Sequence, residues 1–234
     1  MIDTVGVVVP VHNEQKLLPL CLAAIRGARD HLQRSAGRRI EVRIVLVLDR
    51  CTDGSYDIAA AARDVQIVNV DARNVGMARR AGTAHLIAGS PRPSAAVWLA
   101  NTDADSSVPE SWLTAMITEA DHGAHLVLGT ALPVPKLAPP QQRLWHSLHV
   151  PHEGHPHVHA ANFGIRADVY QRLGGWPVLQ TGEDQWLADR AAPAGHLRIV
   201  RTARIPVRTS ARLQARAPRG FSDYLRRLSA TTSA

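Results

Sequence analysis

Acidic and polar residues follow three apolar runs of this sequence. They lie in the segments Pro10–Glu14, Leu48–Gly54 and Asn101–Asp105. Ligands of open α/β folds bind where the carboxyl ends of neighbouring parallel strands meet at one edge of the sheet. If the apolar runs are such strands, the three segments surround a common ligand.

The pair Asp103 and Asp105 is the sharpest of these features, because it directly follows the apolar run Trp98–Ala100. Residues two apart in an extended chain point to the same side, so both carboxylates can face one cation. Two carboxylates leave positions on Mn²⁺ or Mg²⁺ open for the oxygens of a diphosphate. Such a metal would neutralise charge on a departing diphosphate. Asp-x-Asp is also common in solvated turns and at helix N-termini, but its place after a buried strand favours the metal site.

An alternation of strands and helices positions these segments. Strands are predicted over Val5–Val9, Ile40–Leu48, Val65–Val70 and Ala95–Ala100, and helices over Glu14–Leu32, Ser55–Ala62, Ala78–Ala88 and Pro109–Ala120. Strands that alternate with helices indicate βαβ units. The fold class is therefore α/β, with a Rossmann-like, mostly parallel sheet flanked by helices.

The pattern changes after Val127. The segment Leu132–His159 is rich in proline and histidine and is predicted as loop with a short helix over Gln141–Leu148. A strand over Ala160–Ile165 and helices over Gly182–Arg190 and Ser222–Leu228 follow. No internal repeat or low-complexity linker interrupts the chain.

Composition indicates one globular domain in a reducing compartment. The 234 residues are 45% hydrophobic and 20% charged, which suffices for a buried core. No run approaches the ~18 apolar residues that span a bilayer, and the N-terminus lacks the basic region of a secretory signal. Cys21 and Cys51 make neither a disulfide framework nor a metal motif, so we expect the cytoplasm.

The net charge of +7 comes almost entirely from arginine. Arginine suits phosphate oxygens, although the excess also fits a general preference for Arg over Lys. Between Arg198 and Arg227 there are nine arginines against one acid, Asp223, so this basic tail either closes over a diphosphate or is solvated. We expect at most peripheral membrane contact and no nucleic-acid partner, because 4% aromatic residues leave few stacking platforms.

A series of motifs in order gives the sequence a specific likeness. They are the segments Val9–Glu14, Val47–Ser55, Asn74–Gly82, Thr102–Asp105 and Gly182–Leu187. Over roughly residues 4–190 the chain resembles a family 2 glycosyltransferase with the GT-A fold. The resemblance implies a single domain over 1–234. Residues 1–130 would bind a nucleotide sugar, and 131–234 would form an acceptor-side extension with the basic C-terminal tail.

The resemblance also implies roles for the donor-side residues. Pro10, His12 and Glu14 would border the nucleotide base and ribose, and Asp49 matches the acid that accepts a hydrogen bond from a uracil imide. Arg79 would approach the base or the diphosphate. Asp103 and Asp105 match the DXD motif that holds Mn²⁺ or Mg²⁺ against the diphosphate.

On the acceptor side, Asp184 matches the catalytic base of the family, and Glu183 beside it would help to place the acceptor. A carboxylate that takes the proton of an acceptor hydroxyl accelerates transfer by ~10²–10⁴-fold. The N-terminus of the predicted helix at Gly182 would favour ionised Asp184. The alternative is that both acids only stabilise the helix dipole. In-line attack by the acceptor would invert the anomeric centre.

Three departures from the family pattern limit what the resemblance implies. Leu48 and Arg50 replace an acid and a glycine at the end of the second strand. This departure weakens the preference for uracil that the resemblance implies: a UDP-sugar donor stays favoured, and a GDP-sugar or another base stays open. Arg80 stands where asparagine is frequent. There is no Gln-x-x-Arg-Trp segment, so transfer of one sugar is favoured over processive synthesis.

The histidine-rich segment 146–159 has two interpretations. Its histidines are His146, His149, His152, His155, His157 and His159. Clustered histidines can bind a transition metal, but the intervening prolines favour a wall on the acceptor side. Asn162–Ile165 and Gly174–Pro177 also match acceptor-side segments of the family. Trp176 either stacks on a sugar or packs in the core.

Two other functions remain open from the residues. A nucleotidyltransferase on a related scaffold would use the same acids, but it usually has a glycine-rich loop after the first strand, and Val11–Lys16 has no glycine. A non-catalytic nucleotide- or sugar-binding module is the second alternative.

Overall fold

The computed structural model describes residues 1–135, 137–212, 223, 225 and 226. An eight-stranded sheet runs through the molecule in the order β3-β2-β1-β4-β7-β6-β8-β5. The strands are β1 (Thr4–Val11), β2 (Glu41–Asp49), β3 (Val65–Val70), β4 (Val97–Asn101), β5 (Ser106–Ser107), β6 (Leu126–Val134), β7 (Phe163–Arg166) and β8 (Ile199–Ser210). The first four in this order are parallel to one another, and β7 runs antiparallel to both β4 and β6. The predicted α/β class with a mostly parallel sheet is confirmed.

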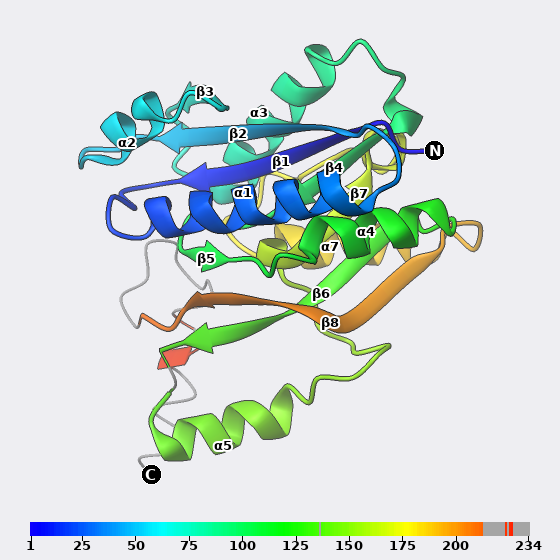
Figure 1. The fold of residues 1–234 in the computed structure, drawn as a ribbon. Coiled ribbons are helices and arrows are strands. Elements are labelled where there is room, and N and C mark those ends of the chain that lie inside the picture. The colour runs from blue at the N-terminus through cyan, green and yellow to red at the C-terminus, as the bar shows by residue number, and fades with distance from the viewer. Residues whose placement is uncertain (136, 213–222, 224, 227–234) are drawn as a thin grey trace.

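Helices cover both faces of the sheet (Figure 1). On one face lie α1 (Leu18–Ser35) and α4 (Trp112–Asp121), with α2 (Ser55–Ala61) packed against the same core. On the other face lie α3 (Val75–Ala88), α6 (Ala167–Arg172) and α7 (Glu183–Ala191). A further helix, α5 (Pro139–Leu148), stands away from the sheet, below β6 and β8 in Figure 1.

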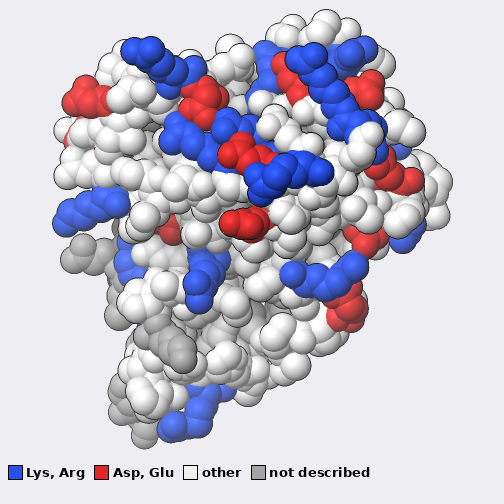
Figure 2. Space-filling model, in the orientation of Figure 1, with Lys and Arg blue, Asp and Glu red and all other residues white. Residues whose placement is uncertain are grey.

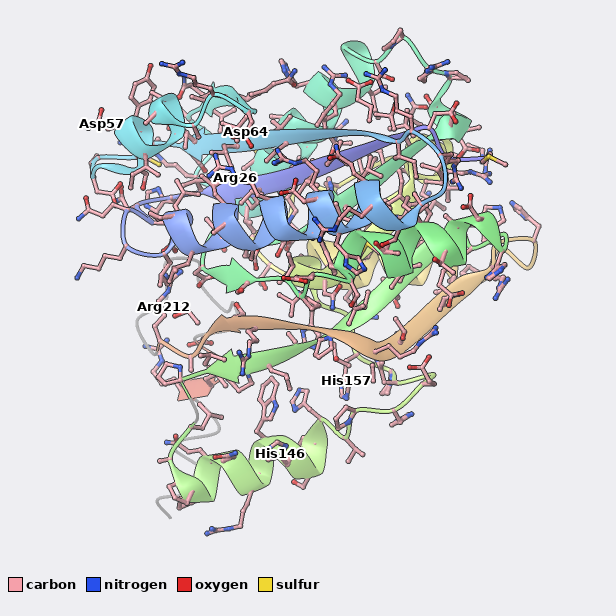
Figure 3. The ribbon with its side chains drawn as sticks, viewed as in Figure 1. Arg26, Asp57, Asp64, His146, His157 and Arg212 are labelled. Atoms are coloured by element: carbon pink, nitrogen blue, oxygen red, sulfur yellow. The ribbon has the colours of Figure 1, made fainter. Side chains whose placement is uncertain are left out.

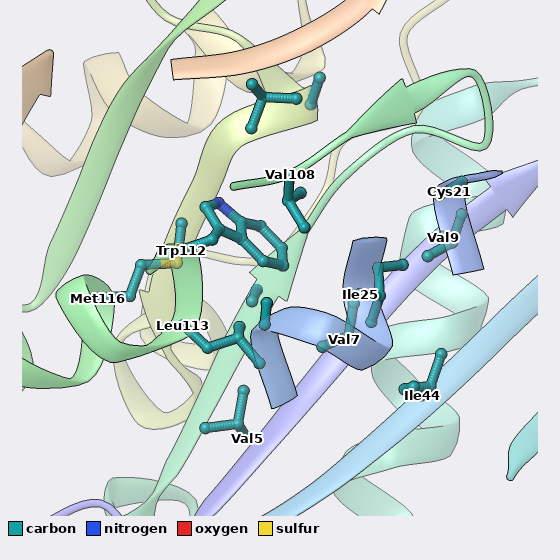
Figure 4. Packing of buried hydrophobic residues seen from close by; sticks show 14 of the residues in the cluster. Val5, Val7, Val9, Cys21, Ile25, Ile44, Val108, Trp112, Leu113 and Met116 are labelled. Carbon is teal, nitrogen blue, oxygen red and sulfur yellow. The ribbon is translucent and has the colours of Figure 1, made fainter. Parts of the chain in front are cut away.

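The apolar run of β1 is continuous because the strand is buried on both faces. Val5, Val7 and Val9 pack against α1 and α4 (Figure 4), whereas Val8 faces the opposite cluster beside α3. Gly82 lets α3 approach this second face. A Cβ atom there would lie 2.8 Å from Val8 Cγ1 and 2.6 Å from Val47 Cγ2. The missing side chain at Gly82 therefore allows α3 to pack closely on β1 and β2.

Several predicted boundaries shift by a few residues. Helix α1 begins at Leu18 rather than Glu14, with Pro19 in its first turn, where the missing N–H of proline costs nothing. Helix α3 begins earlier than predicted, because the Asn74 side chain caps it by accepting a hydrogen bond from the Met77 N–H. A 3₁₀ turn, Ala160–Asn162, takes the place of the first half of the predicted strand before β7.

The sequence analysis predicted no strand at β6 or β8, and this was wrong. Strand β8 pairs with β6 in parallel and with β5 antiparallel. Arg201, Arg204 and Arg208 therefore lie on a strand of the sheet rather than in a closing loop or a tail, with Arg204 and Arg208 exposed to solvent. Residues beyond 212, including most of the helix predicted over Ser222–Leu228, lie outside the described residues.

The surface charge is mixed on the face that Figure 2 shows. Acidic and basic side chains are interleaved over the region of α1 rather than gathered in one basic patch. Asp64, for example, lies 2.5 Å from Arg26 Nη2 and 2.7 Å from Arg29 Nη1. Within the described part of the chain, no helix is both long and apolar enough to cross a bilayer.

Candidate active site

A cavity of about 950 Å³ opens at the carboxyl ends of β1, β2 and β4. The residues given a donor-binding, metal or catalytic role from the sequence all line it, namely Pro10, His12, Glu14, Asp49, Arg79, Asp103, Asp105, Glu183 and Asp184. The strand ends and the start of α7 bring them there from widely separated parts of the chain. The predicted gathering of these acids in one cleft is thus observed, while their individual roles remain predictions.

Asp49 lies at the end of β2 and holds the loops at this edge of the cavity by hydrogen bonds. Its Oδ1 accepts hydrogen bonds from the N–H groups of Ala72 and Arg73 at 2.9 and 3.1 Å, and its Oδ2 accepts one from Asn74 at 3.2 Å. The His12 Nδ1 lies 2.6 Å from the Asp49 carbonyl oxygen. Asp49 therefore ties together the loops that follow β1, β2 and β3, next to the space predicted for the base.

The negative charges of Asp103 and Asp105 are paired with the positive charges of arginine guanidinium groups. Arg79 Nη2 donates to Asp103 Oδ1, and Arg212 Nη2 lies 3.0 Å from Asp105 Oδ2. The same Arg212 nitrogen lies 2.6 Å from Glu14 Oε1. Burial and the nearby Asp103 raise the pKa of Asp105 to about 6. Two cationic groups thus already occupy this acidic rim.

The two aspartates fit a divalent cation in kind and position. Both line the cavity, and their carboxylate oxygens suit Mn²⁺ or Mg²⁺. Among the described residues, however, no group of three or more His, Cys, Asp or Glu side chains could hold a metal. Asp103 and Asp105 alone would therefore be only a partial ligand set for such an ion.

Arg79 joins the acidic rim to the start of α7. Its side chain is 2% exposed, and its Nη1 donates to Glu183 Oε1 at 2.7 Å. The guanidinium also lies over the Trp176 ring, 5.8 Å from the centroid. Trp176 itself is fully buried and packs on Phe163. Trp176 is therefore a core residue and not a platform for a sugar.

Gly182 directs the chain into α7 and sets the position of Asp184. Its φ of +78° is a left-handed conformation that glycine adopts without strain. The Asp184 carboxylate accepts hydrogen bonds from the Ala160 N–H at 2.7 Å and the Gln185 N–H at 2.8 Å. We expected the helix N-terminus to favour ionised Asp184, but the pKa of Asp184 is raised, chiefly by burial. Desolvation therefore outweighs the local hydrogen bonds, and the higher pKa suits a proton acceptor.

Part of the histidine-rich segment forms a wall of this cavity. His149, His157 and His159 line it together with Trp145, whereas His146 and His152 are exposed. Which of the two interpretations of this segment is right stays a prediction.

The sequence analysis missed the part played by Arg212. It had placed this residue in the basic tail, but Arg212 lines the cavity and binds two acids there (labelled in Figure 3). No local pattern indicates this, because the contact depends on β8 running beside β5. Arg73 and Gln180 also line the cavity without having been predicted.

Comparison with known proteins identifies a family and a set of similar folds. Residues 6–174 match the profile of Glycosyl transferase family 2. No curated protein matches the chain.

Solved structures resemble the whole chain at low sequence identity. Staphylococcus aureus TarS 1–349 in complex with UDP is 16% identical, with a TM-score of 0.63, over 98% of this chain and 65% of that one. The mannosyltransferase PcManGT from Pyrobaculum calidifontis, in complex with GDP-Man and Mn²⁺, is 19% identical, with a TM-score of 0.64, over 98% of this chain and 61% of that one.

A third similar structure is glucosyl-3-phosphoglycerate synthase from Mycobacterium tuberculosis, in complex with Mn²⁺, UDP and phosphoglyceric acid. It is 16% identical, with a TM-score of 0.54, over 98% of this chain and 77% of that one. The present chain therefore spans less than two thirds of the first two proteins. At these identities the likeness is one of fold.

Proposed function

The chain belongs to glycosyl transferase family 2, and on that premise we propose that it transfers a sugar from a nucleotide diphosphate sugar to an acceptor hydroxyl. One observation carries the proposal. The acids matched to the family motifs, Asp49, Asp103, Asp105 and Asp184, all open into a single cavity. Family membership favours this reaction over nucleotidyl transfer and over a non-catalytic binding module.

The donor is proposed to lie along the ends of β1, β2 and β4. Its base would lie near Pro10, His12 and Asp49, and its diphosphate near Asp103 and Asp105. Both UDP and GDP-Man occur in the similar structures. A UDP-sugar is the first candidate and a GDP-sugar the second, because Leu48 and Arg50 alter the segment that would meet the base.

Asp103 and Asp105 are proposed to hold Mn²⁺ or Mg²⁺. When bound, the ion would supply positive charge against the donor diphosphate. Similar structures contain Mn²⁺. Arg79 and Arg212 are ion-paired with these two carboxylates beside the cavity, so a metal ion that binds them would share or displace the guanidinium groups.

Asp184 is proposed as the general base. Its carboxylate would take the proton of the acceptor hydroxyl while the hydroxyl oxygen bonds to the anomeric carbon. The bond from that carbon to the diphosphate oxygen breaks on the opposite side, which inverts the centre. Hydrogen bonds from Ala160 and Gln185 fix the Asp184 carboxylate, and Arg79 fixes the neighbouring Glu183. The acids would thus present a fixed acceptor position, where orientation contributes to rate.

A single transfer per acceptor is proposed rather than processive synthesis, because the chain lacks a Gln-x-x-Arg-Trp segment. The assignment of donor and acceptor binding to the two halves of the chain is likewise a proposal. Residues 1–130 would bind the donor, and the segment from 131 would bind the acceptor.

Calorimetric titration of UDP and GDP, with and without Mn²⁺, tests the donor assignment. We expect one nucleotide to bind, and to bind more tightly with Mn²⁺. Asp105→Asn should remove the effect of Mn²⁺. Asp57→Asn is the control, because Asp57 is exposed on α2 and lies outside the cavity lining, and it should behave as the wild type. If neither nucleotide binds under any condition, the proposed function is wrong.

A further inference from the structure

Glu14 and Asp105 both contact the guanidinium group of Arg212, which is labelled in Figure 3. Arg212 Nη2 lies 2.6 Å from Glu14 Oε1 and 3.0 Å from Asp105 Oδ2. Glu14 belongs to the loop after β1, and Asp105 to the short segment between β4 and β5. One nitrogen atom therefore contacts carboxylates from two separate loops. Because like charges at short range repel each other, the point between these two acids is a position for a positive charge.

The fold holds both acids at this position. The Glu14 N–H donates to Ser55 Oγ at 2.8 Å, and the Glu14 carbonyl oxygen accepts a hydrogen bond from the Leu18 N–H at the start of α1. The Asp105 carbonyl oxygen accepts one from the Ser210 N–H at the end of β8. The Glu14 side chain is 6% exposed and that of Asp105 is 13% exposed. Two carboxylates that are so little hydrated need a cation beside them.

Arg212 satisfies this need incompletely. Its Nε is buried and has no hydrogen-bond partner among the described residues. A buried donor that lacks an acceptor costs free energy. Arg212 also lines the cavity, so open space lies next to its side chain. A competing cation that binds Glu14 and Asp105 would therefore allow Arg212 to move to where water can reach its Nε.

A divalent cation suits this position better than a guanidinium group. It carries the two positive charges that balance Glu14 and Asp105, and carboxylate oxygens are the ligands that Mg²⁺ and Mn²⁺ prefer. Both carboxylate oxygens are already within 3.0 Å of Arg212 Nη2. Oxygen ligands lie about 2.0–2.1 Å from Mg²⁺, so each carboxylate would have to approach the centre by less than about 1 Å.

The neighbouring pair of Arg79 and Asp103 is less open to exchange. The Arg79 side chain is 2% exposed, and it also donates to Glu183 Oε1 at 2.7 Å. The Arg212 side chain, in contrast, is 27% exposed. An incoming cation would therefore displace Arg212 more easily than Arg79.

We propose that Glu14 is a further ligand of the divalent cation and that this cation takes the place of Arg212 between Glu14 and Asp105. Asp103 would remain the third acid beside it. The inference rests on the proposed function, because it concerns the metal of that reaction. It gives Glu14 a role different from the contact with base and ribose that the resemblance implies.

The first experiment measures Mn²⁺ affinity in the absence of nucleotide, from the electron paramagnetic resonance signal of free Mn²⁺ at pH 8. Glu14→Met removes both carboxylate oxygens and nearly conserves side-chain length. It should weaken Mn²⁺ binding by about tenfold or more, because loss of a residue that only hydrogen-bonds to a metal ligand already costs about 10–100-fold. Glu110→Met is the matched control, because Glu110 is exposed and lies outside the cavity lining. It should bind Mn²⁺ as the wild type does.

The second experiment separates loss of a ligand from loss of a nearby negative charge. The water molecules on bound Mn²⁺ are counted from the line broadening of its resonance in ¹⁷O-labelled water. If Glu14 is a ligand, water takes its place, and the Mn²⁺ bound to Glu14→Met carries more water than that bound to the wild type. Loss of a remote charge would lower the affinity without changing this number.

Three results would overturn the inference. These are no binding of Mn²⁺ to the wild type without nucleotide, full Mn²⁺ affinity in Glu14→Met, or a weaker affinity with an unchanged number of bound waters. Circular dichroism of the same samples shows whether Glu14→Met is folded. Glu14→Ala, which also lacks the carboxylate, should show the same two changes and takes its place if it is not.

Calorimetry of UDP and GDP with Mn²⁺ on the wild type tests the proposed function independently. If a nucleotide binds with Mn²⁺ while Glu14→Met keeps full Mn²⁺ affinity, only the ligand role of Glu14 is wrong.

Discussion

Replacing Arg79 by Met removes the charge that joins Asp103 to Glu183 while nearly conserving side-chain length. Both carboxylates then lose their partner inside the fold. Breaking a buried ion pair in this way costs about 3–5 kcal/mol. Asp103 is 33% exposed, so water screens part of its charge, but Glu183 is only 7% exposed. We therefore expect the lower end of the range, about 3 kcal/mol in the free energy of unfolding.

The assay is thermal unfolding followed by circular dichroism. For a domain of this size about 1 kcal/mol corresponds to 2–4 °C, so Tm should fall by about 6–12 °C at pH 8. Arg80→Met is the matched control, because Arg80 is the next residue of α3 and is exposed. Its Tm should change by little, as expected for a surface substitution.

The effect of Arg79→Met should also depend on pH. Burial already raises the pKa of Glu183, and loss of Arg79, which lowers it, raises it further. A carboxyl group whose pKa is higher in the folded than in the unfolded state binds more protons when folded. Its contribution to stability therefore falls as the pH rises. The deficit of the variant should be smaller at pH 5.5 than at pH 8. A fall in Tm no larger than that of Arg80→Met, or a deficit that grows at low pH, would refute this account of Arg79.

Asp184→Asn should lower transfer by about 10²–10⁴-fold and leave binding of UDP with Mn²⁺ unchanged by calorimetry. Transfer at the wild-type rate would show that Asp184 is not the base. Arg26 and Arg29 hold the pKa of Asp64 well below its usual range, so the stability from this cluster is present at pH 7 and declines as the pH falls below about 5. Asp64→Asn should lower the free energy of unfolding by about 1 kcal/mol at pH 7, measured by urea titration, with the difference narrowing toward pH 3. Asp57→Asn, an exposed acid of α2, should have a smaller effect, and a deficit of Asp64→Asn that stays constant with pH would contradict the assignment.

The first half of the fold could be predicted because its signals are local. Strands β1 and β4 are apolar along their length, since both faces are buried, and polar residues mark their ends. The acids of the cavity follow these strands directly. Their gathering at one rim follows from the parallel arrangement alone.

The second half depends on distant contacts that leave no local pattern. Strand β6 contains Gly129, a residue that rarely favours a strand. It is needed because a Cβ atom there would lie 2.1 Å from the Asn162 side chain. In β8, arginines and a proline interrupt the apolar alternation. The sequence marked the histidine-rich segment as a whole, but it could not show that His149, His157 and His159 line the cavity while His146 and His152 do not.

The direction of the pKa shift of Asp184 also could not be predicted from the sequence. Its position in the first turn of α7 suggested a stabilised carboxylate. The fold covers that turn with the segment at Ala160, and desolvation reverses the direction of the shift. The sequence locates a titratable group in an element such as a helix, but it does not show how deeply the fold buries that group.

The charges of the cavity give a last prediction, on metal affinity. Among the described residues, the carboxylates of Glu14, Asp103, Asp105 and Glu183 form ion pairs with the two guanidinium groups of Arg79 and Arg212. This excess of negative charge at pH 8 would repel a diphosphate and attract a divalent cation, so a cation should enter before the nucleotide or with it.

Arg212 lies where it must compete with that cation for Asp105. Arg212→Met should therefore tighten Mn²⁺ binding in the absence of nucleotide, by about fivefold for a coupling of ~1 kcal/mol. Electron paramagnetic resonance of free Mn²⁺ at pH 8 measures this directly. Arg208→Met is the control, because Arg208 is exposed on β8 and should leave the affinity unchanged. Weaker Mn²⁺ binding in Arg212→Met would mean that this arginine orders the two acids for the metal rather than competing with it.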